Sequence, residues 1–173
     1  MLTKSDLADP TVIEGWLRDM GLTPTRRTDP GNNWNLEFTV SGASQLVISC
    51  VNPKSIPRAI MLVCGMAAAP DHLSAYSKLD EARRTEFWRQ LRTTLTREFV
   101  EFQIDGTPVS ECPKMLRLSA VRFDDGLTLD SFARSLSSVC KACADAVAHF
   151  TDRLGDARPP ADGEFAFKKL ATQ

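Results

Sequence analysis

The feature that most constrains this chain is a long ladder of apolar residues near its C-terminal end. Between residues 129 and 154 they recur at intervals of three and four, as Leu129, Phe132, Leu136, Val139, Cys143, Val147, Phe150 and Leu154. This spacing places them on one face of an α-helix. Thr128 precedes the ladder and suits the N-cap position of that helix. We therefore expect a long, capped helix that buries its apolar face against another layer of the fold.

A second pattern, of period two, predicts a sheet. Apolar and polar residues alternate over 34–40, which is typical of a half-buried strand in an antiparallel sheet. A short turn at 41–44 leads into a second strand over 46–51, so the pair is expected to form a hairpin. The segment 59–64 is apolar on both faces, as a central strand should be. We expect these three strands to form a meander.

The N-terminal segment predicts a first helix followed by a loop. Asp9 can cap the helix, and Pro10 suits the first helical position because no N–H is needed there. Gly21 can take the positive φ that ends a helix. Residues 23–33 hold two Pro, one Gly, two Asn and two Arg, which indicates a polar loop.

A second helical region and two more strands follow the meander. Pro70 opens the helical region, and Ser77 with Asp80 resembles a capping box for its longest piece. The alternation returns over 100–104 and again over 115–123, which predicts two strands. The expected order is therefore α-β-β-β-α-β-β-α, an α+β fold with an antiparallel sheet packed on helices.

The length of 173 residues fits a single domain. We expect this domain to span residues 1–155. Residues 156–173 contain the pair Pro159-Pro160 and few apolar residues, and we expect them to form a flexible tail.

Charge and composition argue against several classes of partner. The formal net charge of -1 gives no general attraction for nucleic acid or anionic membranes, so neither is expected as a partner. The arginines of 81–97 are interleaved with glutamates, which favours a solvated face over a basic stripe. No apolar run approaches the ~18 residues of a membrane span, and no signal peptide is visible. With five cysteines suited to a reducing compartment, we expect a cytoplasmic protein.

No group of residues carries a recognisable catalytic or cofactor motif, and we expect no metal or cofactor. Cys140 and Cys143 have a metal-like spacing, but a zinc site needs about four ligands. A zinc or redox regulator through this pair stays open as a weaker alternative. Another alternative is an enzyme or small-ligand binder with a pocket between sheet and helices. In that case at least two residues of the set His72, Glu86, Cys112 and Asp124 would have to converge there.

Large aromatic residues that the core does not need are candidate interface anchors. Trp34 leads a strand that could lie at an edge, with Leu36 and Phe38 on the same face. Trp88 follows Phe87 and lies off the main apolar stripe of its helix. We therefore name Trp34, Leu36, Phe38 and Trp88 as interface candidates. The alternative for Trp88 is burial inside the monomer by a wider apolar stripe.

The order of elements, with Phe123-Asp124-Asp125-Gly126-Leu127-Thr128 opening the last helix, resembles the type III secretion chaperone-like fold. It is also similar to the YbjN-type sensory transduction regulators that share this fold. The resemblance covers roughly residues 10–154. It implies a small cytoplasmic dimer that holds a partially extended protein segment, or an uncharacterised relative with an unknown partner, and it gives no catalytic residue to carry over. We therefore expect a non-enzymatic protein-binding or chaperone-like module, binding its partner at a sheet face or edge.

Overall fold

A computed structural model describes residues 7, 9–41, 45–98 and 100–156 of the chain. Its elements confirm the α+β class. They are α1 (Thr11–Asp19), β1 (Thr25–Arg27), β2 (Asn32–Val40), β3 (Leu46–Pro53), β4 (Ala59–Ala67), α2 (Pro70–Ser77), α3 (Glu81–Arg97), β5 (Glu101–Asp105), β6 (Met115–Phe123), a 3-10 turn η1 (Asp124–Gly126) and α4 (Leu129–Leu154). The tail predicted at 156–173 lies outside the described residues except for Asp156.

The six strands form one antiparallel sheet in the order β1-β2-β3-β4-β6-β5. The meander of β2, β3 and β4 is confirmed. After β4 the chain runs through α2 and α3, adds β5 at the far edge and returns as β6 between β4 and β5. The register aligns Leu36, Cys50, Leu62 and Ala120 across four strands. All four are buried, so this row marks the face of the sheet that packs into the core.

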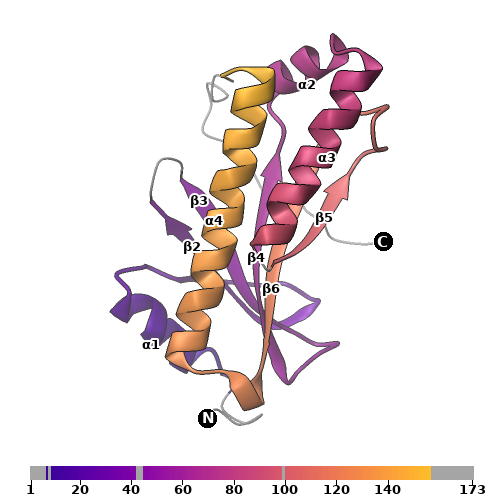
Figure 1. Ribbon diagram of the computed structural model, residues 1–173. Helices are drawn as coiled ribbons and strands as arrows, with labels where there is room; N and C mark the ends of the chain where they lie inside the picture. The colour runs from indigo at the N-terminus through magenta and orange to yellow at the C-terminus, as the bar shows by residue number, and fades with distance from the viewer. Residues whose placement is uncertain (1–6, 8, 42–44, 99, 157–173) are drawn as a thin grey trace.

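The helices lie on that one face, as Figure 1 shows for α3 and α4 in front of the sheet. α4 packs across β4 and β6, and α3 packs beside α4. At the other end, the rings of Trp16 in α1 and Phe132 in α4 lie 5.7 Å apart. One apolar cluster joins the helices to the core face of the sheet. The ladder predicted for α4 supplies much of this cluster, because Phe132, Val139 and Cys143 are fully buried.

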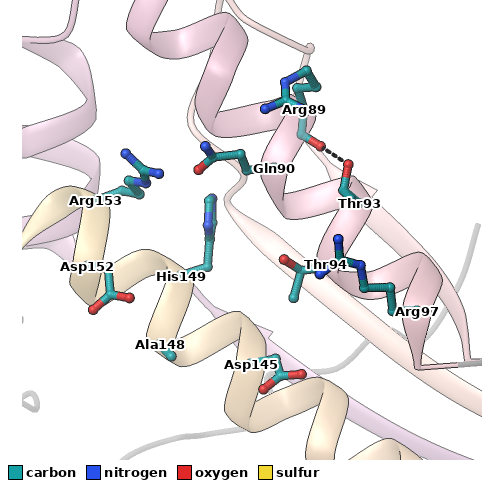
Figure 2. A pocket seen from close by; sticks show the side chains of 10 residues that line it. All are labelled: Arg89, Gln90, Thr93, Thr94, Arg97, Asp145, Ala148, His149, Asp152 and Arg153. Atoms are coloured by element: carbon teal, nitrogen blue, oxygen red, sulfur yellow. Dashed lines mark hydrogen bonds between the residues drawn. The ribbon is translucent and has the colours of Figure 1, made fainter.

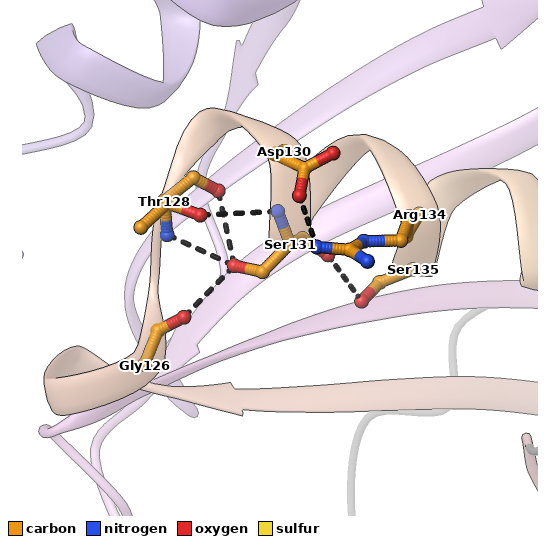
Figure 3. A network of polar contacts seen from close by, with 6 residues as sticks. All are labelled: Gly126, Thr128, Asp130, Ser131, Arg134 and Ser135. Atoms are coloured by element: carbon orange, nitrogen blue, oxygen red, sulfur yellow. Dashed lines mark hydrogen bonds and ion pairs between the residues drawn. The ribbon is translucent and has the colours of Figure 1, made fainter.

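The cap predicted for α4 is confirmed (Figure 3). The Thr128 hydroxyl accepts the N–H of Ser131 at 3.1 Å, and the Ser131 hydroxyl accepts the N–H of Thr128 at 2.9 Å. The turn before it is held to the sheet by Asp124, whose carboxylate accepts two hydrogen bonds from Arg58, at 3.0 and 2.9 Å. The stretch that carries the family resemblance therefore fixes where β6 ends and α4 begins.

The predicted polar loop over 23–33 contains a strand, which is a correction to the sequence interpretation. β1 pairs with β2, Arg26 opposite Leu36. All three residues of β1 are exposed, so no apolar alternation marks the strand. Its side chains are held by ion pairs from other elements instead: Arg26 pairs with Glu14 of α1, and Arg27 pairs with Glu37 of β2.

The helical region is divided, and its predicted capping box is wrong. Ser77 is the last residue of α2, and its hydroxyl donates to the Ser74 carbonyl. Asp80 itself is the N-cap of α3, where its carboxylate accepts the N–H of Arg83 at 2.8 Å. At α1 the N-cap is Pro10 rather than Asp9, although the Asp9 carboxylate still accepts the N–H of Thr11 at 2.7 Å.

Candidate functional site

The four residues predicted as interface anchors lie in the core of the monomer. Trp34, Leu36, Phe38 and Trp88 are between 0% and 8% exposed. Trp34 is not on an edge strand, because β1 covers that side of β2. A side chain without exposed surface cannot anchor a partner, so any docking surface of this monomer must be built from other residues.

Trp88 connects three parts of the fold. Its indole N–H donates to the Tyr76 hydroxyl of α2 at 3.0 Å and to the Glu111 carbonyl at 3.1 Å. The Tyr76 hydroxyl in turn donates to the carbonyl of Val109 at 2.9 Å. Val109 has a φ of 70°, the left-handed region that β-branched residues rarely occupy. Trp88 and Tyr76 thus hold the strained loop between β5 and β6.

The structure does not bring together the residues of the enzyme alternative. Asp124 precedes α4, whereas the His72 ring contacts the carbonyl of Gly155, just after the end of α4. The 26 residues of α4 separate these points by roughly 39 Å at ~1.5 Å per residue. Glu86 pairs with Arg89 on α3, and Cys112 is buried in the loop before β6.

The cysteines of the zinc or redox alternative are largely protonated. Burial raises the pKa of the half-buried Cys140 thiol to about 11. The pKa of Cys143 is raised by its contact with the Cys64 thiol of β4 and by burial. Thiols in this state are poor metal ligands and nucleophiles. Within the described ranges, no group of three potential ligand residues is arranged to hold a metal ion.

The second face of the sheet is the first of two surfaces that the structure offers to a partner. None of the described helices packs on it. The register places Val51, Met61 and Val121 side by side in one row, with Phe123 two residues further along β6. Val51 is buried without belonging to the core cluster, and Phe123 is 53% exposed. We call the accessible members of this row and its extension, Met61, Val121 and Phe123, the outer-face patch.

The second surface is a groove of about 410 Å³ between α3 and α4. Polar side chains from both helices line it (Figure 2): Arg89, Gln90, Thr93, Thr94 and Arg97 from α3, and Asp145, His149, Asp152 and Arg153 from α4. The side chains of Arg153, Gln90 and His149 point toward one another between the helices, whereas the carboxylate of Asp152 points away from α3.

His149 forms part of the wall of the groove and is only 9% exposed. Its Nε2 lies 3.1 Å from the Phe87 carbonyl oxygen, which can only accept, so this nitrogen carries the proton. Burial lowers the pKa of the ring, which is therefore neutral at pH 7. Nδ1 of the neutral ring is then left as a hydrogen-bond acceptor.

The α3–α4 groove could not be found from the sequence, because the arginines of α3 are interleaved with glutamates and suggest only a solvated face. The groove is recognised only from the ion pairs of the folded chain, which show which arginines are neutralised and which are not. Glu86 is satisfied by Arg89, and the Arg89 guanidinium beside it lowers the pKa of Glu86 to about 2. Arg97 and Arg153 form no ion pair with any residue that the structure describes.

Several solved structures share this fold. An uncharacterised protein from Methanothermobacter thermautotrophicus is similar with a TM-score of 0.76 and 24% identity, over 84% of this chain and 99% of that one. YbjN from E. coli is similar with a TM-score of 0.51 and 12% identity, over 86% and 96%. The ExsC-ExsE complex is similar with a TM-score of 0.48 and 15% identity, over 92% of this chain and 100% of that one. The expected topology-level resemblance to YbjN is thus confirmed.

No curated protein sequence matches the chain. Among the helices that the structure describes, none has the length and hydropathy required to traverse a bilayer. A family model matches residues 10–150, which is most of the chain and includes every described element except the end of α4. The chain therefore belongs to the family of uncharacterized conserved proteins DUF2299.

Proposed function

We propose that this protein is a non-enzymatic, chaperone-like protein-binding module that acts as a homodimer in the cytoplasm. The observation that carries the proposal is the outer-face patch, which lies on the face of the sheet where none of the described helices packs. A row of apolar side chains ending in Phe123 lies between the polar strands β1 and β5. An apolar centre with a polar rim is the usual anatomy of a protein interface.

The edge strand β5 supports the same function. Within the described residues, β5 pairs only with β6, so one side of its backbone is available to an added strand. A partner segment that adds a strand gains main-chain hydrogen bonds, and its side chains give specificity. In this proposal the outer-face patch joins two copies of the chain, and a partner segment is bound at the edge strand β5.

The test is the mass of the purified protein in solution, measured by light scattering at two ionic strengths. We expect a dimer that salt does not dissociate, because burial of apolar surface is not screened. Phe123→Asp should weaken the dimer by roughly 100-fold or more, since each copy of a symmetric interface loses a buried aromatic side chain worth ~1.5–3 kcal/mol. Val147→Asp is the matched control, because Val147 is an exposed apolar residue on α4. A monomeric wild type, or a Phe123→Asp protein that is still dimeric, contradicts the proposal.

A further inference from the structure

The α3–α4 groove contains more positive charge than its neighbours neutralise. Arg89 is held by Glu86, with the guanidinium and carboxylate 2.5 Å apart. Asp145 lies 3.8 Å from the ammonium of Lys141. Among the charged lining residues this leaves Arg97, Arg153 and Asp152 without an ion pair inside the described part of the chain. The groove therefore presents two arginines against one aspartate that points away from α3.

The two arginines lie toward opposite ends of the groove. α3 and α4 run antiparallel, because Glu98 at the end of α3 pairs with Lys141, whereas Phe87 contacts His149 further along α4. Arg97 is thus near the Lys141 end, and Arg153 is beyond His149. A ligand that engages both must be elongated and must carry acidic groups at two positions.

Polar side chains from both helices line the groove between the two arginines. Nδ1 of neutral His149 is an acceptor, and a peptide N–H is a suitable donor to it. Thr94 and Gln90 add polar side chains from α3 on the opposite wall. Arginine binds carboxylates through two parallel N–H bonds, and it is enriched among the residues that dominate protein interfaces.

We propose that the α3–α4 groove binds an acidic segment of a partner protein, with Arg97 and Arg153 each holding a carboxylate of that segment. The inference rests on the proposed protein-binding function and adds to it a second binding surface, separate from the edge strand β5, whose ligand is an acidic segment of the partner. The groove lies on the helical side of the molecule, opposite the outer-face patch, so one dimer can present two such grooves.

The experiment measures binding of a fluorescent Glu-rich peptide to the full chain by anisotropy, at low salt and at physiological salt. A peptide with Gln in place of every Glu, a Lys-rich peptide and a single-stranded oligonucleotide are the comparison ligands. The test variant is Arg97→Gln with Arg153→Gln. The matched control is Arg134→Gln, which removes an exposed arginine from α4 far from the groove.

We expect the Glu-rich peptide alone to bind, and the double variant to lose on the order of tenfold in affinity for each arginine, because each makes a charge-assisted pair. The Arg134→Gln protein should bind as the wild type does. Equal losses in the control, tighter binding of the oligonucleotide, or no binding of the Glu-rich peptide would overturn the inference. The dimer measured by light scattering should be unchanged in the double variant, so failure of the groove and failure of the proposed function are distinguishable.

Discussion

The capping box of α4 gives a prediction whose magnitude follows directly from the contacts. Thr128→Ala removes the hydroxyl that accepts the N–H of Ser131 at 3.1 Å. Loss of an N-cap side chain costs about 1 kcal/mol, within a range of roughly 0.5–2 kcal/mol. For a domain of 150–250 residues this corresponds to a fall in Tm of about 2–4 °C.

The second half of the box sharpens the test, because Ser131→Ala removes the reciprocal bond to the N–H of Thr128 at 2.9 Å. Each hydroxyl accepts a hydrogen bond from the backbone N–H of the other residue. We therefore expect the double variant to lose less free energy of unfolding than the sum of the two single losses. Thr96→Ala is a suitable control, since that hydroxyl only donates to the Arg92 carbonyl within α3. The assay is thermal unfolding followed by circular dichroism at 222 nm. If the Thr128→Ala protein is no less stable than the Thr96→Ala control, the capping hydrogen bonds do not stabilise the fold.

Three further predictions concern strain, protonation and a buried hydrogen bond. Val109→Gly should raise Tm, because a left-handed L-residue costs ~1–2 kcal/mol and glycine does not; a lower Tm than wild type contradicts this. Because the folded-state pKa of His149 is lowered from 6.5, the unfolded chain gains the proton first, so stability should decline as pH falls below 6.5. This decline, measured by urea unfolding, should be weaker in His149→Gln. Trp88→Phe should cost roughly 1–3 kcal/mol in the same assay, because the Glu111 carbonyl loses its indole donor; a neutral effect would show that water replaces the bond.

The elements that the sequence predicts well are those whose signal is local. The apolar ladder of α4 and the alternation of β2 each indicate which face of the element is buried. Both elements are present in the structure as expected. β1 could not be predicted in this way, because three exposed residues carry no periodic pattern. It is held by β2 and by the ion pair from Arg26 to Glu14, which lies on a different element.

The candidate site depends still more on tertiary arrangement. Trp88 lies off the main apolar stripe when α3 is considered alone. It is a core residue in the fold, where α2 and the β5–β6 loop supply its hydrogen-bond partners. The α3–α4 groove is defined by two helices that meet only in the folded chain. Arg97 and Arg153 cannot be recognised as a pair, or as unpaired cations, until the ion pairs around them are known.

The place of β6 in the sheet has a consequence for biosynthesis. β4 is a mostly buried, apolar strand, and its second neighbour is synthesised only after α2, α3 and β5 have emerged. On the ribosome the N-terminal meander therefore carries an open, aggregation-prone edge while roughly fifty further residues are added, which takes a few seconds at ~5–20 residues per second. Strand β6 closes this edge by pairing with β4, and β5 joins the sheet only through β6.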